Sequence, residues 1–393
     1  MMKKILKLIW QTSKAEYKYI ASNIPILLVL LGGNVGYGLL YNYMYNPNIV
    51  KETPIAVVDM VDNKLSRTFI QNIDATEQVN VVYVFSDYAE AEKMVKENKI
   101  VGFLYLPQSF SNLGLEYNKS NIMAYGSTLS FLDFLMLQEA TTYTLIDFNA
   151  MLRPIYVNQL SNKDKFAIAK LQPIEIIPNV LFNTEEGYGT YLMPPILIII
   201  IFQTMMICIS SSCGDEREGK KLHVSKLKYG VGYNAISIVV GKVLAYFVIF
   251  AIISLFMLGL LPLIFDLPHI GQPLTLVFMV IPFLIASSAF ALCWLPLYTD
   301  SEKPLIFIVF MSIILLFFSG ISYPLELMPW YWKIMHYILP AASAALCFVK
   351  VNTMGADISQ ILPEITTLWT QSIVYLIISI FVCHIGLKKK HWK

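Results

Sequence analysis

The residues closest to a recognisable chemical motif are Gly214–Lys221, with the sequence GDEREGKK. A phosphate-binding loop has the pattern GxxxxGK[ST], in which backbone N–H groups hold phosphates and the last hydroxyl binds Mg²⁺. Here Lys221 replaces that hydroxyl, and three of the four intervening residues are acidic and would repel phosphate. The preceding segment is a long apolar run rather than a strand. We therefore exclude nucleotide binding here, and any ATP that is involved would bind a different chain.

The other polar residues form no recognisable metal or catalytic pattern. Asp59 and Asp62 could begin a calcium loop, but Ile70 then takes the twelfth position, where a glutamate is required. The five cysteines and five histidines are scattered, without a CxxC pair or a Cys/His cluster. Glu326 is interpreted as a surface carboxylate. The sequence predicts no catalytic residue, no metal and no cofactor in this chain.

The composition indicates an integral membrane protein. The 393 residues are 56% hydrophobic and 14% charged, whereas soluble domains have about 25% charged residues. The net charge is only +2, and no basic patch has interleaved aromatic residues, so nucleic acid is not expected as a partner. Because a charge in lipid costs a few kcal/mol, the stretch 214–221 must lie outside the bilayer.

Six segments are apolar enough for transmembrane helices, which need about 20 such residues. They are residues 20–45, 189–212, 235–265, 274–297, 304–320 and 369–387. Residues 321–350 are apolar and aromatic but interrupted by prolines, which favours short re-entrant or interfacial helices. The predicted fold class is a polytopic α-helical membrane protein with six transmembrane helices, five of them in a membrane domain at 189–393.

Residues 1–19 predict an amphipathic helix in the cytoplasmic membrane interface. Its Lys3, Lys7, Lys14 and Lys18 recur at helical spacing, and apolar residues fill much of the rest. Such a helix lies in the interface with its lysines toward anionic headgroups.

Residues 46–188, between the first two spans, predict an α/β domain. Strands are expected at 55–60, 79–85, 100–106 and 121–127, and helices at 63–73, 87–98, 129–149 and 153–170. Asp62 is the expected N-cap of the first of these helices. An extended segment at 172–182 leads back to the membrane. About 140 residues can bury a core of their own.

The orientation follows from lysine and arginine in the short loops. Both ends of the chain and the 213–234 connection are rich in these residues, whereas residues 266–273 have none. The positive-inside rule therefore predicts that both termini and the 213–234 loop are cytoplasmic. The domain at 46–188 is then extracytoplasmic.

The charged loop at 213–234 is a candidate docking site for another protein. Glu216, Arg217 and Glu218 would offer exposed, charge-assisted hydrogen bonds. A solvated loop whose charges only fix topology is the equally weighted alternative. Lys242, near the start of the third span, is expected to extend toward the interface.

Three blocks resemble the permeases of type-2 ATP-binding-cassette (ABC) exporters, in the branch with a large extracytoplasmic domain after the first span. IAVVDMVDNKLSR at 55–67 is similar to the opening of that domain, EREGKKL…GK at 216–242 to the coupling loop, and FSGISYPLELMP…P at 318–340 to the block after the fifth span. Lys220 replaces the usual threonine, and Asn63 and Lys64 also depart from the pattern. The matching positions are Asp59, Asp62, Ser66 and Arg67; Glu216, Arg217, Glu218, Gly219 and Lys242; and Ser319, Gly320, Pro324, Pro329 and Pro340, with Glu326 inside the last block.

The resemblance implies a transport subunit rather than an enzyme. A cytoplasmic ABC ATPase subunit, which would carry ATP and Mg²⁺, would dock on the coupling loop. A second permease chain, identical or paralogous, would complete a dimer in the bacterial inner membrane. A periplasmic adaptor and an outer-membrane channel are further partners that this branch implies. The cargo would be hydrophobic or amphipathic and would leave the cytoplasm or the inner membrane.

Two other functions compete with this interpretation. A membrane sensor or scaffold would bind a ligand or partner with the 46–188 domain and move no substrate. A membrane enzyme acting on lipid-linked precursors would need a polar constellation near a membrane face, and the sequence offers no candidate.

Overall fold

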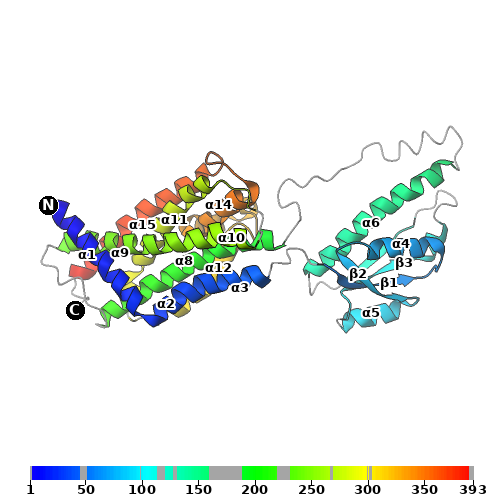
Figure 1. Cartoon of the computed structure of the whole chain (residues 1–393), viewed down its shortest axis with the longest axis horizontal. Helices are drawn as coiled ribbons and strands as arrows, with labels where there is room; N and C mark the ends of the chain where they lie inside the picture. The colour runs from blue at the N-terminus through cyan, green and yellow to red at the C-terminus, as the bar shows by residue number, and fades with distance from the viewer. Residues whose placement is uncertain are drawn as a thin grey trace. The chain divides into compact units, whose positions relative to one another are not determined.

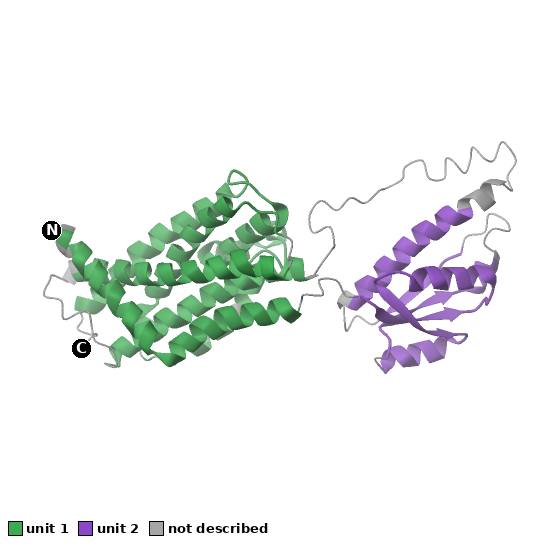
Figure 2. Cartoon of the chain, viewed as in Figure 1, with its two compact units in different colours: residues 1–48, 180–393 green, residues 49–179 purple. Residues whose placement is uncertain are grey.

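The computed structural model describes residues 2–44, 51–97, 99–112, 120–126, 131–158, 188–218, 231–265, 269–298, 300 and 303–388. The chain divides into two compact units (Figure 2). Residues 1–48 and 180–393 form the membrane unit, and residues 49–179 form the inserted unit.

The membrane unit is built from helices, and η marks a short 3₁₀ or π turn (Figure 1). Before the inserted unit come α1 (Met2–Ser22), α2 (Ile24–Leu31), the π turn η1 (Gly32–Gly36) and α3 (Tyr37–Met44). After it come α8 (Tyr188–Arg217), α9 (Val231–Ser254), the π turn η4 (Leu255–Leu260), α10 (Leu261–Ile264), α11 (Pro273–Cys293), η5 (Leu295–Leu297), α12 (Lys303–Phe318), η6 (Leu325–Leu327), α13 (Trp330–Ile338), α14 (Pro340–Met354) and α15 (Leu362–Lys388).

Five stretches of the described residues are long and apolar enough to cross a membrane, and the bent pair α13–α14 would make six. They are Ile24–Met44, Gly189–Arg217, Asn234–Ile264, Pro273–Cys293 and Leu362–Lys388. Each overlaps a predicted span. The predicted fifth span is α12, which has 16 residues and falls short of the roughly 20 that a span needs.

The core of the membrane unit lies among α8, α9, α11, α14 and α15, which pack side by side (Figure 1). Phe202, Tyr246, Phe283 and Phe348 are among its fully buried side chains. The first span joins this core through Asn34, a buried residue in the π turn η1. Asn34 Oδ1 accepts a hydrogen bond from Thr204 Oγ1 of α8 at 3.0 Å.

The prolines of the 321–350 segment define its helices. Pro329 is the N-cap of α13, and Pro340 lies in the first turn of α14, where its missing N–H would have no helical partner. The two helices meet at 89°. Two helices are therefore present in this segment, and their re-entrant or interfacial position stays a prediction.

The inserted unit is a four-stranded sheet with helices, as predicted. Its strands are β1 (Thr53–Asp59), β2 (Val79–Phe85), β3 (Gly102–Leu106) and β4 (Met123–Gly126), in the order β2-β1-β3-β4. Strand β1 pairs in parallel with both neighbours, and β4 is antiparallel to β3. The remaining elements are α4 (Lys64–Asp74), α5 (Tyr88–Lys96), the turn η2 (Gln108–Asn112) and α6 (Phe131–Asn158).

Two local predictions for the inserted unit are wrong. Asn63, not Asp62, caps α4, because its side chain accepts a hydrogen bond from the N–H of Ser66. Helix α6 runs unbroken through residues 150–152, where a break between two helices was expected. The predicted extended segment at 172–182 lies outside the described residues.

Candidate functional site

The predicted cytoplasmic loop begins later than expected. Helix α8 continues through Arg217, so the first charged residues of the 213–234 connection are helical. Asp215 and Glu216 are buried, at 8% and 3% exposed. This corrects the expectation that the charges immediately after the apolar run are solvated.

Lys242 of α9 is the centre of a buried ionic cluster, which we define as Glu16, Ser212, Glu216, Lys242 and Tyr246. Its Nζ lies 2.7 Å from Glu16 Oε1 and 3.1 Å from Glu216 Oε1, and it donates to Ser212 Oγ at 3.2 Å. The Lys242 side chain is 1% exposed. The prediction that Lys242 extends to the interface is wrong, because two carboxylates hold its charge inside the protein. A lysine that is buried to this extent is tolerated only when its ammonium group is paired and hydrogen-bonded.

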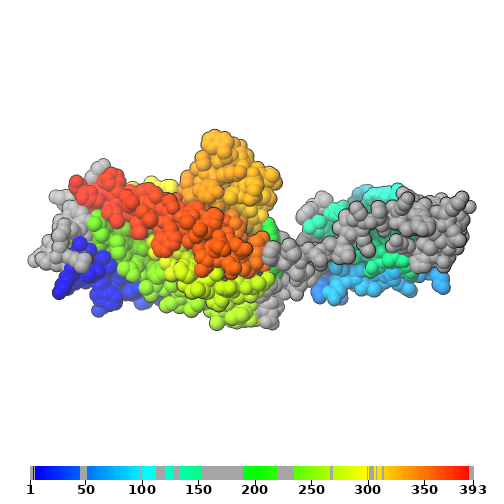
Figure 3. All heavy atoms as spheres, turned by 90° about the horizontal axis from the view of Figure 1, so that it is seen from above, coloured from blue at the N-terminus to red at the C-terminus, as the bar shows by residue number. Residues whose placement is uncertain are grey.

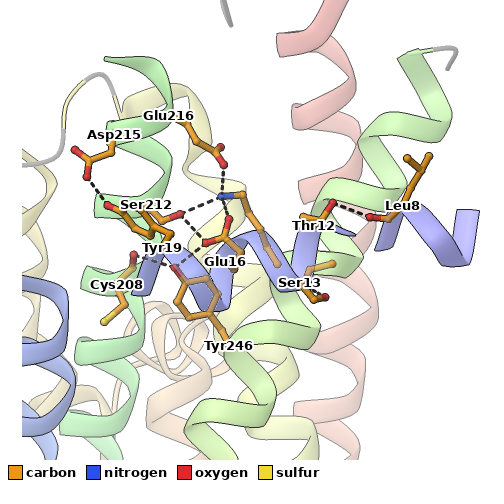
Figure 4. Close-up of polar contacts among 12 residues, drawn as sticks. Leu8, Thr12, Ser13, Glu16, Tyr19, Cys208, Ser212, Asp215, Glu216 and Tyr246 are labelled. Atoms are coloured by element: carbon orange, nitrogen blue, oxygen red, sulfur yellow. Dashed lines mark hydrogen bonds and ion pairs between the residues drawn. The ribbon is translucent and has the colours of Figure 1, made fainter. Parts of the chain in front are cut away.

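Glu16 brings α1 into the cluster. Its Oε2 accepts hydrogen bonds from Ser212 Oγ at 2.8 Å and from Tyr246 Oη at 3.3 Å, and the side chains converge from three helices (Figure 4). Sequence reasoning missed Glu16, although a signal was present. Glu16 is the sole acidic residue in the basic helix α1, and a lone carboxylate among lysines is a candidate for a buried partner.

Close packing explains how α1 reaches α9. A Cβ at Gly241 would lie 2.6 Å from Thr12 Cβ and 2.9 Å from the Ile9 carbonyl oxygen. With no side chain there, the Ser13 hydroxyl donates to the Gly241 carbonyl at 2.8 Å. Gly241 therefore sets the approach that places Glu16 against Lys242.

A second contact joins α1 to the end of α8. The Tyr19 hydroxyl donates to Asp215 Oδ2, and Asn23 Nδ2 donates to the Tyr19 oxygen at 3.1 Å. Burial, and then the hydrogen bond to Asp215, raise the pKa of Tyr19 well above its usual value. The phenol therefore stays protonated and keeps donating.

The predicted docking residues differ in burial and in their hydrogen-bond partners. Arg217 donates through Nη2 to the Leu295 carbonyl at 2.8 Å and through Nη1 to the Pro296 carbonyl at 3.2 Å. Glu216 faces Lys242. Glu218 is exposed, and Gly219 lies outside the described residues. The expected exposure thus holds for Glu218, is contradicted for Glu216, and is reduced for Arg217 by its bonds to η5.

The 318–340 block forms the turn from α12 into α13. Gly320 has φ +83°, a conformation that glycine adopts without strain. The Ser319 hydroxyl donates to the Leu316 carbonyl at 2.6 Å, and Lys333 Nζ donates to the Glu326 carbonyl at 3.2 Å. Pro324 is the N-cap of η6. The buried His336, which the sequence did not single out, contacts the Phe318 carbonyl through Nδ1 at 2.8 Å. These residues shape the turn.

The 55–67 block forms the turn from β1 into α4. Asp59 Oδ1 accepts from the N–H groups of Val61 and Asp62 at 2.9 and 3.1 Å, and Ser66 Oγ donates to Asp59 Oδ2 at 2.6 Å. Arg67 pairs with Asp62 at 2.8 Å on the surface. All four predicted residues therefore meet, and they hold a backbone turn.

The fold and the cluster define a polytopic membrane protein in which a buried ion network ties three helices together at one end. No group of three or more metal-ligating side chains is arranged for a metal within the part of the chain that the structure describes. The contacts of the cluster join α1, α8 and α9.

Comparison with protein families identifies the class further. Residues 21–381 match the family model described as ABC-2 family transporter protein, and the chain belongs to this family. No curated protein and no solved structure matched the chain. Membership makes the chain the membrane component of an ABC transporter, and the family implies partnering with an ATP-binding subunit. Glu16 and Tyr19 lie before the matched residues, whereas Glu216 and Lys242 lie within them.

Proposed function

We propose that this chain is the permease subunit of an ABC exporter, energised by a separate ATPase subunit that docks on the 213–234 side of the membrane unit. Its substrate is hydrophobic or amphipathic and moves out of the cytoplasm or the inner membrane. A second permease chain completes the transporter, with both termini cytoplasmic and the inserted unit outside. A periplasmic adaptor and an outer-membrane channel are further candidate partners of the inserted unit.

The observation that carries this proposal, together with the family membership, is the buried ionic cluster. A force applied at the end of α8 acts on Glu216. Glu216 pairs with Lys242 of α9, and Lys242 also pairs with Glu16 of α1. Breaking a buried ion pair is strongly unfavourable. The three helices therefore respond to a push as one body.

The roles of the docking residues follow from their surroundings. Exposed Glu218 offers a charge-assisted hydrogen bond to a partner. Glu216 and Lys242 transmit the movement within the permease. Arg217 fixes the end of α8 against η5 through the Leu295 and Pro296 carbonyls. ATP-driven closure of the ATPases would push this end, and the spans would open the path outward.

Site-specific photo-cross-linking tests the docking. A photoreactive residue replaces Glu218 in the full chain, in native membranes, and the cross-linked protein is identified by mass spectrometry. Lys93 of the inserted unit, which is also exposed, is the matched control position. We expect an ABC ATPase subunit at position 218 and none at position 93.

The transport step needs its own measurement. The purified complex in vesicles should move an apolar fluorescent substrate in the presence of ATP, and E218K should weaken this movement and the co-purification of the ATPase together. An ATPase that cross-links at 93 instead of 218 would overturn the docking assignment. With an intact protein, the absence of any ATPase partner and of ATP-dependent movement would favour the sensor or scaffold.

A further inference from the structure

One face of α1 carries a stripe of exposed lysines. Lys3, Lys7, Lys14 and Lys18 are all exposed. At 3.6 residues per turn, these four positions fall within about 60° of the helix circumference. The amino-terminal segment, in blue, lies on the surface at one end of the membrane unit (Figure 3).

The charge of this lysine face is not neutralised within the helix. Glu16, the one carboxylate of α1, is 0% exposed and faces Lys242. It lies about 160° around the helix from Lys14. The helix is thus divided into a buried face that holds the ionic cluster and an exposed face of four cations.

Large apolar side chains border the lysine face. Trp10 is 67% exposed and lies about 20° from the stripe, and Leu6 is 58% exposed on the same side. Tryptophan beside lysine is the pairing found at the membrane–water boundary, where the ring sits at headgroup level and cations meet phosphate. In bulk water the exposed ring of Trp10 would lack the apolar contact that the membrane boundary offers.

We propose that the lysine face of α1, with Trp10, binds anionic phospholipid headgroups and prefers them to zwitterionic ones. The ligand is the phosphate-bearing, net negative headgroup of a lipid such as phosphatidylglycerol. Each lysine near an anionic membrane surface contributes about a fivefold increase in binding affinity. This inference rests on the geometry of α1 and does not depend on the proposed transport function.

The position of the face gives the binding a consequence for the fold. Outside the lysine face, Ser13, Glu16 and Tyr19 hold α1 to α8 and α9. A lipid that binds only the packed helix stabilises that packing by mass action. Anionic lipid should therefore raise the melting temperature of the membrane unit, and zwitterionic lipid should raise it less.

The test measures which lipids the full chain retains. The purified chain is mixed with equal amounts of phosphatidylglycerol and phosphatidylcholine, and bound lipids are counted by native mass spectrometry. Wild type should be enriched in phosphatidylglycerol. In the variant K3Q/K7Q/K14Q/K18Q this enrichment should fall at least tenfold. The variant K3R/K7R/K14R/K18R should keep the enrichment, because it keeps the positive charge that binds the headgroup.

A matched variant removes the same charge elsewhere. K64Q/K93Q/K96Q/K99Q changes four exposed lysines of the inserted unit and should leave the enrichment unchanged. The half-variants K3Q/K7Q and K14Q/K18Q should each lose part of the enrichment, which keeps the test decisive if the fourfold variant is poorly expressed. Equal enrichment in the fourfold glutamine variant and wild type would overturn the proposal. So would loss of a co-purified protein with unchanged lipid selection, which would assign the face to a protein partner.

Discussion

Two ionic groups in this protein use the same kinds of residue for different purposes. In the membrane unit, Lys242 and Glu16 pair at 1% and 0% exposure. In the inserted unit, Arg67 and Asp62 pair at a similar distance, 2.8 against 2.7 Å, with 66% and 77% of their side chains exposed. The distances are nearly equal, so distance does not distinguish the two pairs.

Burial decides what each pair does. A buried charge that loses its partner keeps its full desolvation cost, so Glu16, Glu216 and Lys242 must stay together and fix three helices. An exposed pair is screened by water and salt, and it contributes little to stability. The position of each pair in the fold therefore gives it its role.

The largest effect should come from removing the lysine of the buried cluster. Lys242→Met leaves Glu16 and Glu216 buried without their cation and should destabilise the membrane unit by roughly 3–5 kcal/mol. The measurement is the apparent melting temperature of the full chain in detergent, followed by size-exclusion chromatography after heating.

The same assay separates charge from packing. The exposed Lys93→Met is the control and should melt like wild type. The triple variant E16Q/E216Q/K242M removes the charges together and should recover part of the loss. A single Lys242→Met variant as stable as wild type would show that the cluster is not what ties α1 to α9.

An intermediate effect is expected at Tyr19, which is half-buried beside Asp215. Its pKa is raised in the folded protein, so above pH 10 the unfolded phenol loses its proton while the folded one keeps it. The unfolded state then binds fewer protons, and stability falls with rising pH by at most roughly 1.4 kcal/mol per unit. Below pH 10 this contribution is fully present.

Tyr19→Phe should remove this alkaline dependence. Melting temperatures of wild type and Tyr19→Phe, compared from pH 9 upward, should differ at pH 9 and converge as the wild-type bond is lost. Parallel curves across the whole range would contradict the assigned role. Tyr37→Phe, an exposed tyrosine of the first span, is the control.

The smallest effect is expected at the exposed pair. Arg67→Ala should leave hydrogen exchange in α4 unchanged, because water replaces its contact with Asp62. Ser66→Ala in the same turn is the sensitive comparison, since it removes the buried hydrogen bond to Asp59 and should speed exchange of the α4 amides. Equal protection of the α4 amides in both variants would mean that burial does not determine how much each contact stabilises this turn.

Much of the architecture was predictable because its signals are local. Hydropathy located the five long apolar stretches found among the described residues. The alternation of strand and helix patterns located the sheet of the inserted unit. The ends of elements were less certain. Helix α8 runs to Arg217 rather than stopping at Ser212, because its last charged residues find partners inside the protein.

The sequence by itself determined that this is a membrane protein with an inserted α/β unit, and its motifs indicated the ABC-2 family. Apolar length, proline positions and charge bias act over a few neighbouring residues and can be read without a fold. Only the tertiary structure decided that Lys242 is buried between Glu16 and Glu216. These residues lie on three helices far apart in the chain. The sequence gives the type of a charged residue but does not show whether water or a buried partner surrounds its side chain.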